Sequence, residues 1–238
     1  MIDLKRDGHV FTLTMTDGQN RWNTNFVRAF AEAIDEIEAS DGPAALVTTS
    51  SNEKFFSNGL DLDWIQAKDP AAIEAGGDRK AFGSEFMTLM ARVITLPIPS
   101  IAAMNGHAFG AGLMVSLCHD WRIMREDRGF ACANEMQLGM VIPREELSLF
   151  KHKLPANTFF ETVQLARRWG GNDALNAGVV QQTATADGLL DAARAKAEEL
   201  APLGANRKQY KAQKESMYGE NASLYDVHGP AHLLRNHK

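Results

Sequence analysis

An α/β fold with largely parallel strand pairing is the fold class that this sequence predicts. Short strand-like segments alternate along the chain with stretches in which apolar residues recur every three or four positions. Parallel strands need a crossover connection, and amphipathic stretches of this kind supply the crossover helices. The chain of 238 residues is long enough for one large domain or two small ones.

The first half of the chain supplies most of the expected sheet. Residues 10–15 predict a strand, because β-branched and large apolar residues lead into the turn Asp17-Gly18. A helix is expected from Thr24 to about Ile37, with Asn23 or Thr24 as its N-cap. Further strands are expected at residues 44–49, 99–105 and 120–124, and further helices at residues 82–94 and 111–118.

After residue 155 the pattern is helical nearly to the end. Apolar stripes predict helices at residues 159–169, 173–177 and 189–200. The segment after residue 204 carries a net charge of +3, against −8 for the rest of the chain. Its spacing gathers four basic side chains on one side of a helix: Arg207, Lys208, Lys211 and Lys214. Such a stripe is either a solvated helix face or an edge that faces phosphate groups.

The composition is that of an ordinary globular protein, with 45% hydrophobic and 23% charged residues. A net charge of −5 argues against a surface built to hold nucleic acid. The two cysteines, Cys118 and Cys132, match neither a C-x-x-C pair nor a zinc spacing, so we expect a reduced, cytoplasmic protein. The N-terminus does not resemble a signal peptide, and no apolar run approaches the ~20 residues of a membrane span.

Two glycine-bearing turns lie where a strand is expected to lead into a helix. Residues 55–62 have the sequence FFSNGLDL, and residues 105–114 have NGHAFGAGLM. The first N–H groups of a helix have no partner within it, so they can bind a negatively charged oxygen beyond the helix start. Two such sites facing each other would form an oxyanion hole. Neither turn matches G-x-G-x-x-G or the phosphate-loop pattern, which disfavours nucleotide binding.

Three motifs together resemble the crotonase, or enoyl-CoA hydratase/isomerase, superfamily. They are FSNGLDL at residues 56–62, NGHAFGAGLM with the later LCHD at residues 105–120, and ANEMQLG at residues 133–139. They occur in the family's order and approximate spacing, and the similarity extends from about Val10 to Val180. The resemblance implies a spiral of ββα units with a C-terminal helical region. It also implies an acyl-CoA thioester as substrate, with coenzyme A as part of that substrate, no separate cofactor and no metal.

The resemblance also assigns residues to roles. The backbone N–H groups of Leu60 and Ala111 are the expected oxyanion-hole donors for the thioester oxygen as it becomes an enolate. The substrate pocket is expected to include four further residues: Asn23, Gly59, Gly110 and Met114. Lys208 and Lys211 are candidates for binding the CoA phosphates. Residues 1–190 are expected to form the core with the acyl-CoA site, and residues 191–238 a helical segment that builds a homotrimer or a dimer of trimers.

The number of carboxylates predicts which reaction occurs. Hydratases of the family carry two glutamates, because adding water to a double bond needs one group for the water and one for the α-proton. Here Met114 stands at the first position and Glu135 at the second. One carboxylate suffices to move a double bond, and ANEMQLG also resembles the 3,2-trans-enoyl-CoA isomerases. We therefore expect Glu135 to act as the single acid/base of a 3-enoyl-CoA isomerase, with a pKa raised by neighbours such as Met114, Met136 and Met140.

Other interpretations stay open at this point. The chain could be a hydratase with a non-standard acid, another acyl-CoA enzyme such as a thioester hydrolase or dehalogenase, or an acyl-CoA binder without turnover. Asp61 is expected to cap a helix that begins near Leu62. The remaining candidate side chains are expected to be structural or solvent-facing: Asp63, His107, Cys118, His119, Glu161, His228 and His232.

Overall fold

The structure is a computed structural model, and it describes residues 1–218 apart from the side chains of Arg144 and Glu145. Its centre is a six-stranded sheet in the order β1-β2-β3-β5-β7-β9. The strands of this sheet are β1 (Ile2–Asp7), β2 (Val10–Met15), β3 (Ala45–Ser50), β5 (Ser100–Met104), β7 (Trp121–Arg125) and β9 (Gln182–Ala184). Strands β1 and β2 form an antiparallel hairpin, and every later pairing is parallel, which confirms the predicted α/β class.

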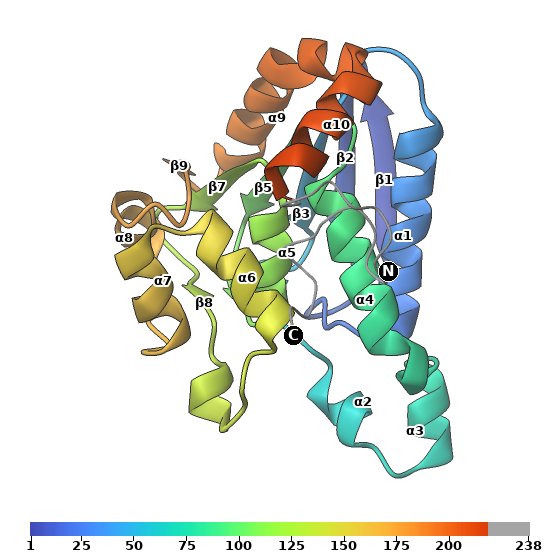
Figure 1. The fold of residues 1–238 in the computed structure, drawn as a ribbon, viewed down its shortest axis with the longest axis vertical. Helices are drawn as coiled ribbons and strands as arrows, with labels where there is room; N and C mark the ends of the chain where they lie inside the picture. Colours follow the sequence, from blue (N-terminus) through green and yellow to red (C-terminus); the bar gives the residue numbers. More distant parts are fainter. Residues whose placement is uncertain (219–238) are drawn as a thin grey trace.

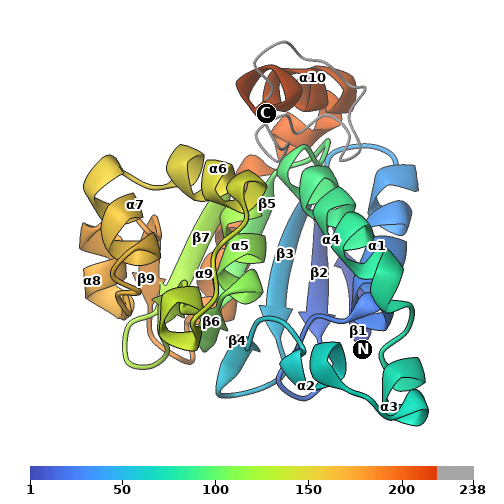
Figure 2. The same cartoon turned by 60° about the horizontal axis from the view of Figure 1, so that its bottom comes forward.

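A second, smaller sheet turns this arrangement into a spiral. It consists of the parallel strands β4 (Phe55–Ser57), β6 (His107–Phe109) and β8 (Ala131–Cys132). Three times the chain passes from a strand of the large sheet to a strand of the small one and then into helices. Figure 2 shows the strands β4 and β6, which follow β3 and β5. The expected ββα units are therefore present, although the sequence patterns did not locate strands this short.

Helices connect the strands and cover both faces of the large sheet. They are α1 (Thr24–Ala39), α2 (Leu62–Gln66), α3 (Pro70–Ala75), α4 (Arg79–Ile94), α5 (Ala111–Cys118), η1 (Glu135–Leu138), α6 (Arg144–Lys153), α7 (Ala156–Val163), α8 (Gly171–Asn176), α9 (Leu189–Leu200), η2 (Ala201–Ala205) and α10 (Arg207–Tyr218). Helix α1 begins where expected, because the Asn23 side chain accepts a hydrogen bond from the Phe26 amide at 3.0 Å. None of the helices within residues 1–218 has both the length and the apolar composition needed to cross a bilayer.

The two faces of the large sheet bury separate cores, because successive side chains of a strand point to opposite sides. On one face, residues such as Leu46 and Ala102 pack with helices α1, α4 and α5. On the other, Val47 and Ile101 pack against the small residues of α9, including Ala193. Figures 1 and 2 show these helices on opposite sides of the sheet. Helix α9 is therefore part of the main body, and the expected boundary at residue 190 does not separate it from the core.

One predicted helix is wrong in its second half. Helix α7 ends at Val163, whereas the apolar pattern predicted a helix to Trp169. Ala166 has φ +47°, outside the right-handed helical region. Trp169 instead forms an antiparallel bridge with Ala131, and its Nε1 donates to Thr162 Oγ1 at 2.8 Å. Its apolar character therefore reflects contacts made across the fold rather than along a helix.

Candidate active site

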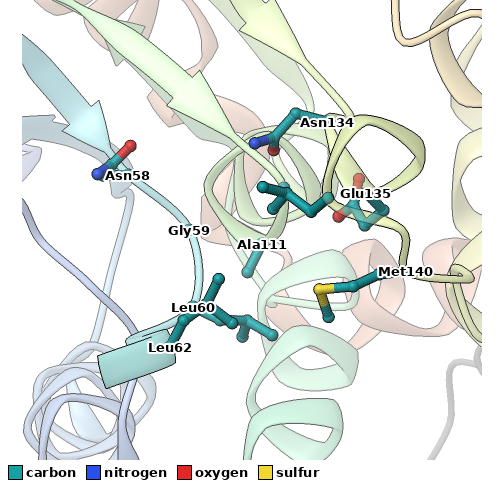
Figure 3. A pocket seen from close by; sticks show the side chains of 10 residues that line it. Asn58, Gly59, Leu60, Leu62, Ala111, Asn134, Glu135 and Met140 are labelled. Atoms are coloured by element: carbon teal, nitrogen blue, oxygen red, sulfur yellow. The ribbon is translucent and has the colours of Figure 1, made fainter. Parts of the chain in front are cut away.

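The two glycine turns and the third motif meet at one edge of the small sheet. Because strands β4, β6 and β8 are parallel neighbours, the segments that follow them emerge at the same edge. A pocket of about 340 Å³, including its open mouth, lies there. Its lining residues are Asn58, Gly59, Leu60, Leu62, Gly110, Ala111, Asn134, Glu135, Leu138 and Met140, and Figure 3 shows most of them.

The first two turns approach so closely that glycine is required. Gly59 has φ +81°, and a β-carbon at this position would lie 2.8 Å from the Phe109 carbonyl oxygen. The same point is 3.7 Å from the Ala111 nitrogen. A β-carbon on Gly112 would lie 2.5 Å from the Ser57 carbonyl oxygen, so the start of α5 is packed directly against β4. The backbone next to Leu60 is therefore held beside the start of helix α5.

The Leu60 amide points away from Trp22, the residue with which Leu60 forms a β-bridge. Leu60 forms a parallel bridge with buried Trp22, in which the Trp22 amide donates to Gly59 O at 2.9 Å and the Asp61 amide donates to Trp22 O at 3.0 Å. Alternate residues of an extended chain present their N–H groups to opposite sides. The Leu60 N–H therefore points away from Trp22, and it has no hydrogen-bond acceptor among residues 1–218.

The Ala111 amide is free for a different reason. Ala111 is the first residue of α5, and the first helical bond at this end joins the Met114 amide to Gly110 O. The Ala111 N–H consequently has no acceptor in the described part of the chain, as expected for the first turn of a helix. Two unpaired amides, from Leu60 and Ala111, thus border the same pocket. They are the groups that an oxyanion would need.

The Glu135 carboxyl group lies on the third side of the pocket. Glu135 is the first residue of η1, and its Oε2 is buried without a hydrogen-bond partner among the described residues. Burial raises the pKa of Glu135 above its ordinary value, because desolvation disfavours the charged form. Among the described lining residues it is the only ionisable side chain. The carboxyl can therefore exchange a proton at a higher pH than an exposed glutamate does.

Two residues expected at the pocket lie behind or beside it. Met114 is 1% exposed in the core of α5 and is not among the lining residues. Asn23 caps α1, and its Nδ2 donates to Asp61 Oδ2 at 3.3 Å. Asp61 in turn caps α2, as expected, by accepting from the Trp64 amide. Of the methionines expected near Glu135, only Met140 lines the pocket, and Met136 is 47% exposed.

The basic stripe of helix α10 is divided between surface and interior. Lys208 is exposed and Lys211 half-buried, but Lys214 is buried and pairs with Asp120 at 2.8 Å. Arg207 donates to the Ile37 carbonyl. Figures 1 and 2 both place α10 at the end of the molecule opposite α2, which borders the pocket. Lys208 and Lys211 therefore do not border the pocket of their own chain.

The remaining candidates from the sequence occupy structural positions. Cys118 and His119 are buried, and the His119 ring contacts Thr48 Oγ1 at 2.8 Å. Glu161 forms an ion pair with Arg167. Asp63 pairs with Arg21, and His107 accepts a hydrogen bond from the Phe130 amide. No three-residue metal cluster occurs among the described residues, and His228 and His232 lie outside them.

Four lining residues were not singled out from the sequence as pocket residues: Asn58, Leu62, Asn134 and Leu138. All four lie inside the first and third of the three motifs that carry the resemblance, so their positions were available from the motifs. Met140 follows the third motif directly, and its amide donates to Glu135 O at 2.9 Å. This bond turns the chain back toward the carboxylate, and Met140 lines the pocket beside Glu135 as expected.

A spiral of ββα turns, with two free amides and a buried carboxyl at one pocket, defines a protein of the crotonase fold. A family model for enoyl-CoA hydratase/isomerase matches residues 5–225, and the chain belongs to this family. Enoyl-CoA delta isomerase 3 of Arabidopsis thaliana is 29% identical over 95% of this chain and 96% of its own length. A Salmonella enteritidis carnitinyl-CoA dehydratase is 31% identical over 85% of this chain and 76% of its own. A solved structure of a probable enoyl-CoA hydratase from Mycobacterium tuberculosis has a TM-score of 0.79 at 26% identity, covering 91% and 87% of the two chains.

Proposed function

We propose that this protein converts 3-enoyl-CoA thioesters to trans-2-enoyl-CoA. The observation that carries the proposal is that Glu135 is the only ionisable side chain among the described residues of a pocket bordered by two unpaired amides. The name of the Arabidopsis thaliana relative, an enoyl-CoA delta isomerase, supports the same reaction. Coenzyme A enters as part of the substrate, and the reaction consumes no other reactant.

The proposed reaction moves one proton and one pair of double-bond electrons. The Glu135 carboxylate removes a proton from the α-carbon, and the electrons of that C–H bond shift into the thioester to give a conjugated dienolate. The Leu60 and Ala111 amides donate to the oxygen that becomes negative, which lowers the barrier to removing a weakly acidic proton. The Glu135 carboxylic acid then returns the proton to the γ-carbon, and the double bond forms between the α- and β-carbons.

Hydration is disfavoured by the position of Met114. Hydration calls for two carboxylates, one to polarise the water and one to transfer the proton at the α-carbon. The side chain that replaces the first of them is a thioether, which has no proton to donate. It is also buried in the core of α5 rather than exposed to the pocket. A single carboxyl group beside a planar intermediate can reach both carbons of an allylic shift.

The assembly is part of the proposal. We expect a homotrimer or a dimer of trimers, in which Lys208 and Lys211 would reach the CoA phosphates bound by a neighbouring protomer. Their position far from their own pocket fits such an exchange. Sedimentation velocity measures the assembly. Replacing both lysines by Ala should raise KM for the CoA substrate several-fold at low salt without changing kcat, and an unchanged KM would contradict the assignment.

Product analysis of purified protein with a 3-enoyl-CoA tests the reaction. The expected product is 2-enoyl-CoA, and Glu135→Gln should lower its rate of formation by about 10²–10⁴ while leaving acyl-CoA binding intact. Glu161→Gln, which alters a surface ion pair, is the matched control and should keep the rate. Formation of 3-hydroxyacyl-CoA without 2-enoyl-CoA, release of free CoA or halide from suitable substrates, or binding without turnover would each overturn the proposal.

A further inference from the structure

Ser57 is buried between the two segments that carry the proposed oxyanion donors, and it does not line the pocket. It is the last residue of strand β4 and is 0% exposed. A β-carbon on Gly112, the residue after Ala111, would lie 2.8 Å from Ser57 Cβ and 2.9 Å from Ser57 Oγ. The Ser57 side chain therefore touches the first turn of α5, while its own strand leads directly into the turn that carries the Leu60 amide.

The Ser57 hydroxyl group uses its full capacity for hydrogen bonds. It donates to Asn20 O at 2.7 Å and accepts from Trp22 Nε1 at 3.0 Å and from the Gly59 amide at 3.3 Å. A hydroxyl group has one proton to donate and two lone pairs that accept, so nothing is left for a further partner. The hydroxyl thus ties the residue before Leu60 to the segment that contains Asn20 and Trp22.

The acceptor of this hydroxyl group is itself held firmly. Asn20 is 0% exposed and has φ +51°, a left-handed conformation that asparagine adopts more readily than most residues. Its Nδ2 donates to Ser50 Oγ at 2.6 Å and to Phe56 O at 3.0 Å, and its Oδ1 accepts from the Asp17 amide at 2.9 Å. The Ser57 hydroxyl group is therefore anchored to a fixed point of the fold.

We propose that Ser57 is a positioning residue, whose hydroxyl group holds the Leu60 amide where it and the Ala111 amide can donate to one oxygen atom. The inference rests on the proposed function and adds a residue that acts through the backbone, because Ser57 itself is buried away from the substrate. Without the hydroxyl group, the Gly59 amide and the Trp22 indole N–H would lose their acceptor, and buried donors are costly to leave unpaired. The turn would shift to satisfy them, and the Leu60 amide would move with it.

Ser57→Ala should lower kcat with 3-enoyl-CoA by about 10- to 100-fold, since a displacement of the order of 1 Å at a reacting group is enough for such a loss. KM should stay close to that of the unmodified protein, because the lost stabilisation belongs to the transition state. Ser116→Ala is the matched control: Ser116 is also 0% exposed, and its hydroxyl donates to Leu113 O at 2.7 Å within α5. It should keep kcat even if its melting temperature falls as far.

Ser57→Cys separates the hydrogen bonds from packing. A thiol donates and accepts more weakly than a hydroxyl group does, but it is larger than the methyl group of alanine. If the hydrogen bonds position the turn, the cysteine variant should keep more of kcat than Ser57→Ala. A greater loss in the cysteine variant, or a kcat of Ser57→Ala equal to that of Ser116→Ala, would overturn the inference.

Infrared spectroscopy tests the positioning without any turnover. The probe is hexanoyl-CoA with a ¹³C-labelled thioester carbonyl, which has no double bond to move. Donation from two amides weakens the C=O bond, so binding should lower its stretching frequency in the unmodified protein and in Ser116→Ala, and lower it less in Ser57→Ala. The absence of a shift in the unmodified protein, or equal shifts in both variants, would overturn the inference; if Ser57→Ala does not fold, Ser57→Cys takes its place in this comparison. The expected shifts without any formation of 2-enoyl-CoA would refute the proposed reaction and leave the role of Ser57 standing.

Discussion

The Glu135 carboxylate lies against the backbone of Gly110. Its Oε1 is 3.0 Å from the point that a β-carbon on Gly110 would occupy. Gly110 also has φ +49° and ψ −118°, a conformation that residues with a side chain rarely adopt. The residue that precedes the Ala111 amide therefore also determines how near the carboxyl can come to it. One glycine links the proposed oxyanion donor to the proposed base.

Gly110→Ala should lower kcat by about 10- to 100-fold, because a displacement of the order of 1 Å at a reacting group is enough for such a loss. The added methyl group would press on Oε1 and strain the backbone, so the melting temperature should also fall. Gly83→Ala is the control: Gly83 is exposed in helix α4 with no atom near its β-position. That change should stabilise the helix by up to ~1 kcal/mol and keep kcat. Equal kcat values for the Gly110 variant and the unmodified protein would contradict the proposed placement of the base.

The buried Glu135 carboxyl should make stability depend on pH. Because burial raises its pKa, the folded protein binds this proton more tightly than the unfolded chain does. The folded state is therefore favoured below the ordinary glutamate pKa and loses that advantage as pH rises through the raised value. Glu135→Gln removes the titrating group, so its melting temperature relative to the unmodified protein should be higher at pH 7 than at pH 4. A difference that shrinks with rising pH would contradict the burial of an ionisable group here.

The same raised pKa sets the acid side of the activity profile. The reaction begins with the ionised carboxylate, so kcat/KM should decline on acidification with an apparent pKa above the ordinary glutamate value. Adding a polar group nearby, as in Met140→Gln, should move this decline to lower pH. The check is a pH profile of initial rates with a saturating and a limiting substrate concentration. A decline centred below the ordinary glutamate pKa would exclude Glu135 as the titrating base.

Lys214 should contribute to folding rather than to substrate binding. Its Nζ pairs with Asp120 Oδ2 at 2.8 Å, and the Tyr210 hydroxyl donates to the same oxygen at 3.2 Å. Removing one partner of a buried ion pair costs about 3–5 kcal/mol, so Lys214→Ala should lower the free energy of unfolding by that amount. Lys208→Ala, at an exposed position of the same helix, should stay within about 0.5 kcal/mol. Urea unfolding of the two variants measures the difference.

The helix carrying these lysines shows what the sequence alone could not predict. A spacing of four basic residues places them on one side of α10, but it does not say whether that side faces water or Asp120. The partners Asp120 and Lys214 are far apart in the chain, and only the fold brings them together. The C-terminal end of helix α7 could not be predicted for the same reason: Trp169 pairs with Ala131, which is distant in the sequence.

Local chemistry was predicted more successfully. Asn23 and Asp61 cap the helices for which they were expected, since a cap depends on residues a few positions apart. Leu60, Ala111 and Glu135 border one pocket as the motifs implied. Met140 lines the same pocket, as expected, but Met136 is exposed and Met114 is buried in α5. Which of the three methionines borders the pocket depends on how the chain folds around η1, and residue spacing does not contain that information. The catalytic roles of Leu60, Ala111 and Glu135 stay predictions.

Ala111→Pro should remove one oxyanion donor while leaving the fold in place. Proline is accepted at the first position of a helix, where Ala111 stands, and the Ala111 N–H makes no hydrogen bond within the described residues. Gly110 has no β-carbon, which removes one of the two clashes that proline usually imposes on the residue before it. We expect the melting temperature to change by only a few degrees and kcat/KM for 3-enoyl-CoA to fall by about 10²–10³. Ala111→Gly keeps the donor and should retain activity near the unmodified level. If the proline variant folds and isomerises its substrate as fast as the glycine variant does, the Ala111 amide does not bind the oxyanion, and the mechanism proposed for this pocket is wrong.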